Sequence, residues 1–455
     1  MNTTNNITKR DFLKASAAFG LGSAANVFSS FEALAQTAQT EDYRALVCVF
    51  MFGGNDANNM LIPTDSAAYN RYAAARSNLA LPAASLLPIS PSNTAAKFGL
   101  HPAMTGIANL FSGSAAQPPK AALVANVGPL VVPTTKAQWE ARSVPLPDNL
   151  FSHSDQQSQW QSAQYERPSN GWGGRLAERL IDEGTSNRGY SVLSVTGGNL
   201  WETGDRSLSA YKVSASGRFG FDFYNPTGND PLSMAITETL ATPYSHLFEQ
   251  GFVDVMGRSI EVQRVLTSAL EGSTINTVFP NSSLGNQMRM VARLIAARQK
   301  LGLKKQCYFC SIGGFDTHGD DQLTRQAELL GDVSSAISAF YAATKELNVD
   351  EKVTTFTASD FNRTFTSNGQ GSDHGWGGHH MVVGGSVQGG KLFGSFPEQI
   401  VRGPQDSGGQ GNWIPTTSTE AYAATLGRWF GANDEVLGQV FPRLSGFNPN
   451  VGFLG

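Results

Sequence analysis

Four short segments of the chain are rich in apolar and β-branched residues, and each is followed by glycine or polar residues. They are residues 44–52, 121–127, 305–312 and 353–358. A short apolar run that ends in turn residues indicates a strand buried on both faces, as in a parallel sheet. The sequence therefore predicts four such strands, and a further short strand at residues 381–383.

Long helical patterns separate these segments. One apolar face comprises Leu284, Met288, Val291, Leu294 and Ile295, and a second, over residues 321–347, comprises Leu323, Leu330, Val333, Ile337 and Phe340. Strands that alternate with helices of this length indicate an α/β fold with a mostly parallel central sheet flanked by helices. Ligands of such folds bind outside the carboxyl ends of the strands.

Two stretches interrupt this alternation. Residues 79–98 are rich in Pro, Ser and Ala and predict a surface loop, while residues 197–232 are rich in Gly, Asn, Ser and aromatic residues and predict a cap or lid. We find no internal repeat and no linker that would divide the chain. The prediction is a single domain over residues 36–455 with these two insertions.

The first 35 residues have the pattern of an export signal. The basic residues Lys9 and Arg10 precede a small, weakly apolar run from Ala15 to Val27, and residues 33–35 (Ala-Leu-Ala) resemble a cleavage site. The order of the residues resembles a twin-arginine signal in which Lys9 replaces the first Arg. We expect export by the twin-arginine machinery to the periplasm or beyond the cell, with no transmembrane segment in the mature protein. The alternative is an uncleaved amphipathic helix.

Charge and cysteine content exclude several classes of protein. Lys and Arg number 33 and Asp and Glu 37, so the net charge of −4 argues against a basic nucleic-acid binder. Three Cys exclude a disulfide scaffold. Cys307 and Cys310 have the spacing of a redox pair or half a zinc site, but residues three apart on a strand point to opposite faces. We interpret them as buried apolar residues. No G-x-G-x-x-G motif follows the first strand, which argues against dinucleotide binding.

Acidic and imidazole side chains gather after the predicted strands. They are Asp56 after the first strand, Asp316 and His318 after residues 305–312, Asp360 after residues 353–358, and His374, His379 and His380 in or beside the glycine-rich loop that follows. Carboxylates and neutral imidazoles that converge on one sheet edge suit a divalent ion such as Zn, Mn or Mg. The alternative for each motif alone is an ordinary turn, with the Asp as a helix cap.

A candidate nucleophile lies at the start of the predicted helix 156–164. A hydroxyl there, on Ser152 or Ser154, would lie in the positive field of the helix terminus and could attack or bind an anion. Either serine could instead be only the helix cap. Arg363 could hold a phosphate or sulfate group through a bidentate fork, or pair with a surface carboxylate.

Several long motifs together resemble one exported bacterial family. These are GGNDANNMLIP, SHSDQQSQW, GGFDTHGDDQ, TASDFNRTFTSNGQGSDHGWGGHHMVVGG and GGKLFG. The family is known as domain of unknown function 1501, the resemblance covers nearly the whole mature chain, and the family is similar to the alkaline phosphatase and sulfatase superfamily. That relationship implies a parallel sheet between helices, a two-metal site and a Ser, Thr or Cys nucleophile at a helix start.

The resemblance also implies roles for individual residues. Asp56 corresponds to the ligand after the first strand and Ser152 to the serine of the Ser-His-Phe pattern. Asp316 and His318 correspond to an acidic and imidazole pair for the other metal. Asp360 stands where the superfamily has Asp-His, and His380 resembles a late ligand, with His374 and His379 as alternatives.

The sequence departs from the superfamily pattern at three places. Phe361 replaces the His after Asp360, Asp316 and His318 are more closely spaced than usual, and Ser154 stands where the family tends to have Phe. The resemblance implies a metal-dependent hydrolase of phosphate or sulfate esters that uses Zn, Mn, Ca or Mg and acts on an anionic ester. The departures favour the alternative, a non-catalytic exported binding or assembly protein with the same fold.

Overall fold

The computed structural model describes residues 43–166, 168–181, 190–206, 208, 210–217, 224–225 and 228–455. The predicted signal, residues 1–35, lies outside these ranges. None of the helices within them combines the length and the apolar character that crossing a bilayer requires.

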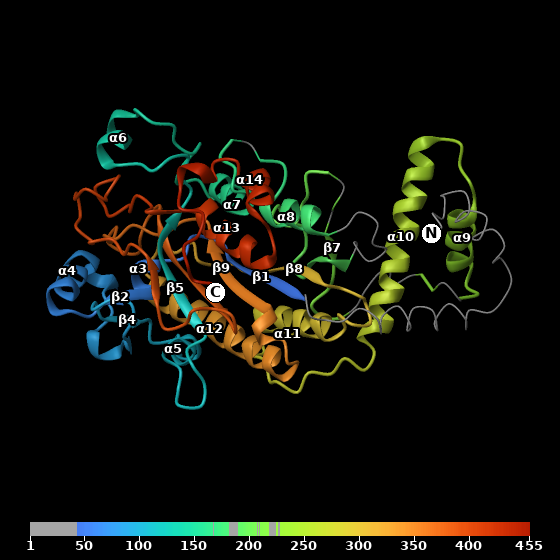
Figure 1. The fold of residues 1–455 in the computed structure, drawn as a ribbon, viewed down its shortest axis with the longest axis horizontal. Helices are drawn as coiled ribbons and strands as arrows, with labels where there is room; N and C mark the ends of the chain where they lie inside the picture. Colours follow the sequence, from blue (N-terminus) through green and yellow to red (C-terminus); the bar gives the residue numbers. More distant parts are fainter. Residues whose placement is uncertain are drawn as a thin grey trace, which may run out of the picture.

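A nine-stranded sheet forms the centre of the molecule (Figure 1). Its strands are β1 (Arg44–Met51), β5 (Ala121–Gly128), β6 (Val192–Ser194), β7 (Tyr211–Lys212), β8 (Lys305–Ile312), β9 (Val353–Ser359), β10 (Gly378–Gly384), β11 (Leu392–Gly394) and β12 (Thr417–Ser418). They lie in the order β11-β5-β10-β9-β1-β8-β6-β7, with β12 also paired to β5. Only β10 runs antiparallel to its neighbours, β5 and β9. The mostly parallel α/β sheet predicted from the sequence is confirmed.

Helices cover both faces of this sheet (Figure 1). One face carries α5 (Thr105–Ser112), α11 (Ser283–Ala296) and α12 (Gln322–Glu346), and the other carries α7 (His153–Ser162), α8 (Trp172–Leu180), α13 (Thr419–Phe430) and α14 (Asp434–Val440). Successive side chains of a strand point to opposite faces. Accordingly, Val47 and Val49 of β1 pack in the core beneath α11 and α12, whereas Leu46 and Cys48 pack in the core beneath α8 and α13. The continuous apolar run of β1 follows from burial on both sides.

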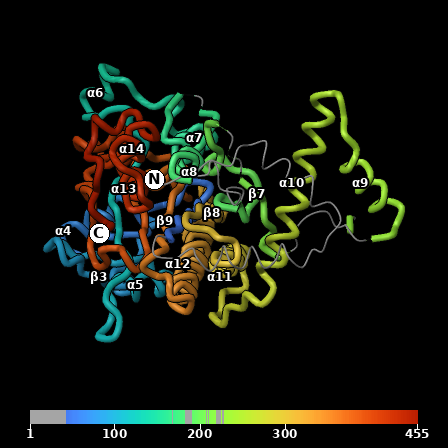
Figure 2. Tube along the Cα trace, turned by 45° about the vertical axis from the view of Figure 1, so that its right-hand side comes forward, coloured from blue at the N-terminus to red at the C-terminus, as the bar shows by residue number. Residues whose placement is uncertain are grey.

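The remaining elements lie around this sandwich. They are α3 (Ala57–Met60), α4 (Ser66–Arg76), α6 (Lys136–Ala141), α9 (Pro231–Ala241), α10 (Leu247–Leu270) and a small sheet of β2 (Leu61–Pro63), β4 (Phe98–Leu100) and β3 (Leu87–Ile89). In both views α9 and most of α10 stand apart from the sheet (Figures 1 and 2). The end of α10 joins the core through Leu266 and Leu270.

The stretch at residues 79–98 differs from the predicted loop because it contains strand β3, which pairs antiparallel with β4. Leu86 and Ile89 are buried, and this burial of apolar side chains fixes the segment against the small sheet. The stretch at residues 197–232 contributes β7 and the first residues of α9 among its described parts. Cys307 and Cys310 are buried and unpaired, as expected.

Candidate metal centre

The predicted chemistry lies at one edge of the sheet. Loops that leave the carboxyl ends of the parallel strands β1, β8 and β9 meet there. Because β10 is antiparallel to β9, the loop that enters β10 reaches the same edge. Helix α7 also begins at this edge, so four segments can place side chains around one point: the loops after β1 and β8, the loop between β9 and β10, and the start of α7.

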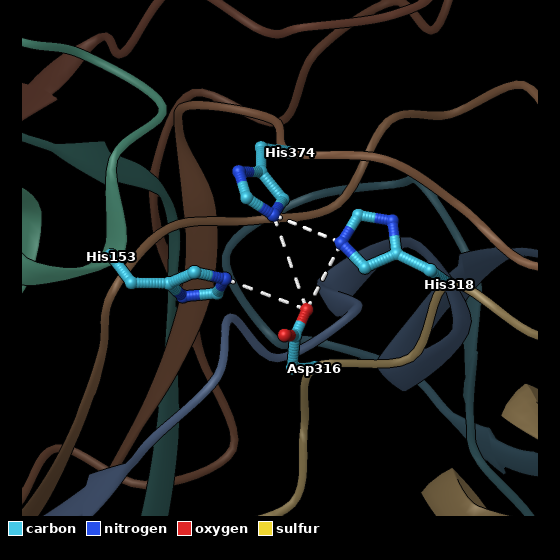
Figure 3. Close-up of side chains that lie close together, drawn as sticks. All are labelled: His153, Asp316, His318 and His374. Carbon is cyan, nitrogen blue, oxygen red and sulfur yellow. Dashed lines mark hydrogen bonds and ion pairs between the residues drawn. The ribbon is translucent and has the colours of Figure 1, made fainter.

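Four side chains converge at this point (Figure 3). Asp316 and His318 come from the loop between β8 and α12, His374 from the loop before β10, and His153 is the first residue of α7. Each offers one ligand atom, and these atoms lie within 4.8 Å of one another. This cluster could hold a metal ion.

The distances within the cluster suit a single small ion. Oδ1 of Asp316 is 3.0 Å from Nε2 of His318, 3.4 Å from Nε2 of His153 and 3.9 Å from Nε2 of His374. Ligand atoms about 2.0–2.1 Å from a tetrahedral zinc ion would lie about 3.3 Å apart. The side chain of Asp316 is 52% exposed and that of His153 is 29% exposed. Solvent and solutes can therefore reach the cluster.

All three imidazoles turn Nε2 inward and hold Nδ1 against an acceptor. Nδ1 of His153 lies 2.7 Å from Oδ2 of Asp360, and Nδ1 of His374 lies 2.6 Å from the carbonyl oxygen of Phe151. Nδ1 of His318 is 3.3 Å from Oδ1 of Asp373. Metal-binding histidines are usually oriented in this way, because an outer acceptor fixes the tautomer that leaves Nε2 free to coordinate.

Two of the inward nitrogen atoms, Nε2 of His318 and Nε2 of His374, face each other. On His374, Nδ1 carries the proton because the Phe151 carbonyl oxygen only accepts, so Nε2 of the neutral ring has a lone pair. On His318, Nε2 accepts from Nη1 of Arg363 at 3.1 Å. These two Nε2 atoms are 2.9 Å apart, beside the carboxylate of Asp316. Arg363 supplies a positive charge to His318 and Asp316, whereas Nε2 of His374 keeps a lone pair that a metal ion could accept.

Nε2 of His153 is buried and makes no hydrogen bond within the described part of the chain. It lies 3.4 Å from Oδ1 of Asp316, and a bound ion would give this buried atom a direct partner. The hydrogen bond to Asp360 raises the pKa of His153 more than burial lowers it. Burial is the main cause of the lowered pKa of His374, which keeps that ring neutral.

Arg363 lies beneath the cluster and is completely buried. Its guanidinium donates to the carbonyl oxygens of Gly53, Gly54, Phe315 and Ser372. It also donates to Oδ1 of Asp316 at 2.6 Å. Burial by itself would raise the pKa of Asp316, but the hydrogen bond and charge of Arg363 outweigh it and lower that pKa.

The guanidinium of Arg363, which the sequence predicts to bind an anion, is therefore already engaged by acceptors of the protein itself. The donors of Arg363 face main-chain carbonyls, His318 and Asp316, so the side chain positions the loops and one candidate ligand. A contact from Arg363 to a substrate stays a prediction.

Asp360 lies directly behind His153 and is not among the four converging residues. Its Oδ2 accepts from Nδ1 of His153, from Nε2 of Gln157 at 2.8 Å and from the main-chain N–H of Gly53 at 3.1 Å. In this arrangement Asp360 orients a candidate ligand rather than offering its own oxygen to the same ion. Phe361, where the superfamily pattern has His, packs against His153 and His374 with ring centroids 4.7 and 4.6 Å apart.

Three other predicted ligands lie outside the cluster. Asp56 is buried, forms an ion pair with Arg76 and accepts from Nε2 of Gln322 at 2.7 Å. His379 and His380 belong to β10, which begins before the strand predicted at residues 381–383. Their side chains are buried against Phe396 and Trp160, respectively. The structure does not bring these three residues to the point where the other ligands meet.

Ser152 precedes His153 and occupies the N-cap position of α7, but its side chain makes no capping hydrogen bond. Instead its hydroxyl donates to Oδ2 of Asp155 at 2.5 Å, and this hydrogen bond is the main cause of the lowered pKa of Asp155. Oγ of Ser154 is 3.3 Å from Oγ of Ser152. The geometry leaves either hydroxyl available as the nucleophile, and that role stays a prediction.

The residue that sequence reasoning missed is His153. It follows Ser152 directly in the sequence, and an imidazole at a helix start beside the strand ends is the signal that points to it. The helix begins at His153 rather than at the predicted Gln156, and this earlier start directs the imidazole toward Asp316.

Comparison with known proteins identifies the family. Residues 43–403 match the family described as "Protein of unknown function (DUF1501)". The chain belongs to this family. A search of curated proteins finds no match.

Two solved structures match most of the chain at low similarity, and one of them is a sulfatase. The crystal structure of Ps i-CgsB has a TM-score of 0.36 and 10% identity, over 90% of this chain and 77% of that one. The PsFucS1 sulfatase from Pseudoalteromonas sp. has a TM-score of 0.33 and 11% identity, over 89% of this chain and 72% of that one.

Proposed function

We propose that the protein is an exported metal-dependent hydrolase of phosphate or sulfate esters. The observation that carries this proposal is the inward convergence of three Nε2 atoms and one carboxylate oxygen, with each Nδ1 held from outside. The exposed side of the cluster gives an anionic ester access to this point. The predicted twin-arginine signal at residues 1–35 would deliver the folded protein to the periplasm or beyond.

The donor set favours Zn or Mn over Ca or Mg. Imidazole nitrogen suits zinc and other transition metals, whereas Ca and Mg prefer a shell of oxygen atoms. His153, His318 and His374 supply nitrogen and Asp316 supplies oxygen. When bound, the ion would polarise the ester oxygen as a Lewis acid.

The protein's own residues would carry the remaining steps. Oγ of Ser152 would attack phosphorus or sulfur, forming a covalent ester as the bond to the leaving oxygen breaks. The proton of Ser152 would pass to Asp155, to which it is already hydrogen-bonded, and the leaving oxygen would take a proton from water. A second water would then hydrolyse the serine ester, with Ser154 as the alternative nucleophile.

A second candidate is a non-catalytic exported binding or assembly protein. The pairing of Asp56 with Arg76 favours it, because a two-metal site would need the carboxylate that this arginine neutralises. Phe361 in the position of an expected imidazole points the same way. In this case the centre would hold a structural ion, and Ser152→Ala would leave the cellular phenotype unchanged.

Metal content tests the centre directly. Mass spectrometry of the purified native protein should find about one equivalent of Zn or Mn, and both His153→Ala and Asp316→Asn should lose it. His246→Ala removes an exposed imidazole away from the cluster and should retain the metal. Absence of metal from the native protein, or full occupancy in the folded His153→Ala variant, would overturn the assignment.

Activity then separates the two candidates. 4-Nitrophenyl phosphate and 4-nitrophenyl sulfate should be hydrolysed by the metal-loaded protein, and Ser152→Ala should reduce kcat by about 10³-fold or more if Ser152 is the nucleophile. An equal loss in Ser154→Ala alone would transfer the role to Ser154. A metal-loaded protein inert toward a panel of both ester types would favour the binding protein.

A further inference from the structure

A cavity lies at the start of the loop that carries Asp316 and His318. Its volume is about 740 Å³, within the range of about 300–1,000 Å³ that is typical of small-molecule sites. The residues that follow β6, β7 and β8 line it, together with side chains of α11 and α12. These three strands are parallel neighbours, so the cavity lies at their carboxyl ends, where α/β folds bind ligands.

The cavity wall is positively charged although the whole chain has a net charge of −4. Lys212 and Arg325 contribute to the wall, and no carboxylate is among the described residues that line it. Arg325 has one acidic neighbour, Glu328, at 3.4 Å. Exposed ion pairs of this kind contribute little free energy, so Arg325 can exchange that contact for a ligand. Two cations without a lining carboxylate favour an anionic ligand.

Hydroxyl groups and a fixed amide line the rest of the wall. Gln287 is held on both sides, since its Oε1 accepts from the N–H of Ser311 at 2.8 Å and its Nε2 donates to the Ser311 carbonyl at 3.0 Å. The same Nε2 donates to Oγ of Ser283 at 3.2 Å, which leaves the hydroxyl hydrogen of Ser283 free to donate elsewhere. Ser214 adds a further hydroxyl to the lining. Hydroxyls with an apolar floor of Ile312 and Leu329 suit a ligand that is itself hydroxylated.

The cavity is continuous in sequence and space with the loop that carries the candidate ligands. Gly313 lines the cavity and Asp316 is three residues later, a Cα distance of at most about 11 Å. The guanidinium of Arg325 packs on Gly314, where an added Cβ would lie 2.5 Å from Nη2. The cavity and the candidate metal centre therefore lie at the two ends of one short loop segment, Gly313 to Asp316.

We infer that this cavity binds the part of the substrate beyond the cleaved bond, a carbohydrate or other polyol that carries at least one further sulfate or phosphate group. Lys212 and Arg325 bind the further anionic group, and the serine hydroxyls bind the polyol. That this ligand is a substrate rests on the proposed hydrolase function. The affinity of the cavity for an anionic carbohydrate does not depend on turnover.

Binding of sucrose octasulfate, measured by calorimetry at low salt, tests the cavity. The double variant Lys212→Gln/Arg325→Gln should bind this probe at least tenfold more weakly than the unaltered protein, and neutral sucrose should not bind measurably. The matched control is Lys97→Gln/Arg71→Gln, which removes the same two charges from exposed positions near α4 and β4. It should change the Kd by less than twofold.

The His153→Ala variant separates this inference from the proposed function. Unchanged binding in His153→Ala together with loss in the Lys212/Arg325 variant supports the cavity, even if the native protein proves free of metal or inert. Equal Kd values in the cavity variant and the unaltered protein overturn the inference. Loss only in His153→Ala also overturns it, since the probe would then bind at the metal centre and the hydrolase would still stand.

Discussion

At the scale of single residues, the candidate metal centre depends on groups that stand behind the ligands. Asp360 holds the ring of His153, the Phe151 carbonyl holds His374, and Arg363 holds Asp316. Outer contacts of this kind fix the orientation and basicity of a ligand. Their removal should therefore affect metal affinity without removing a ligand.

The first prediction concerns Asp360→Asn. The change keeps the size of the side chain but removes the charge that orients His153, so metal affinity should fall about 10–100-fold. Competition with a chelator measures this affinity. Asp373→Asn is the matched control, because its contact with His318 is longer, at 3.3 Å, and partly exposed. It should have the smaller effect, and the reverse order would contradict the role given to Asp360.

Arg363→Lys should destabilise the fold. Lysine cannot reproduce the planar fork that bonds the carbonyls of Gly53, Gly54 and Phe315. Buried carbonyls left without a donor cost about 1–3 kcal/mol each. We expect the free energy of unfolding in urea to fall by about 3 kcal/mol or more. The exposed control Arg71→Lys should stay within about 0.5 kcal/mol, and an equally small change in Arg363→Lys would refute the argument.

At the scale of elements, contact between the loops after β1 and β8 fixes the position of Asp316, one of the candidate ligands. The N–H of Phe315 donates to the carbonyl of Phe52 at 3.1 Å. Gly53 has a φ of +112°, and a Cβ there would lie 2.4 Å from the backbone nitrogen of Asp316. Glycine at this position permits both the backbone conformation and the close approach.

Gly53→Ala should separate these loops. The positive φ and the clash with backbone atoms should cost at least about 2 kcal/mol of unfolding free energy, and metal occupancy should fall as Asp316 moves. Gly313→Ala is the control, because a Cβ there meets no atom within 4 Å. Denaturation and metal analysis of both variants check the prediction, and full metal occupancy in Gly53→Ala would contradict it.

At the scale of the whole molecule, the fold buries histidines and glutamates whose contributions to the free energy of unfolding change in opposite directions with pH. Burial lowers the pKa of His101 to about 4 and those of His379 and His380 to about 3. Between the pH of these folded-state pKa values and about pH 6.5, these histidines bind more protons in the unfolded chain than in the folded protein. The contribution of these histidines to stability is therefore complete above pH 6.5 and is lost as the pH falls.

Two buried glutamates have the opposite effect. Burial raises the pKa of Glu202 to about 8 and that of Glu420 to about 7. Above about pH 4.5 these glutamates therefore bind more protons in the folded protein than in the unfolded chain. Their contribution to stability is lost as the pH rises toward 8.

The free energy of unfolding should accordingly pass through a maximum near neutral pH and fall on both sides. Glu202→Gln should stabilise the protein more at pH 8 than at pH 5, because it removes a group that must ionise in the core. Urea denaturation at both pH values provides the measurement. Equal effects of Glu202→Gln at the two pH values would mean that Glu202 is ionised or exposed in the folded protein.

Much of the fold could be predicted because burial on both faces leaves a direct signal. The predicted strand at residues 44–52 corresponds to β1, and the predicted helix at residues 321–347 to α12. The strand predicted at residues 381–383 is shorter than β10, which begins with Gly378 and two histidines. These polar residues are buried against aromatic rings, a tertiary contact that no local pattern shows.

By itself the sequence determined the α/β class, the family and the edge of the sheet where the candidate ligands lie. Periodicity and strand ends are local properties, so they can be read along the chain. Only the tertiary structure decided which polar side chains meet there. It places His153 beside Asp316, His318 and His374, and it pairs Asp56 with Arg76. Such choices depend on distances between loops far apart in sequence, which packing of the whole sheet sets.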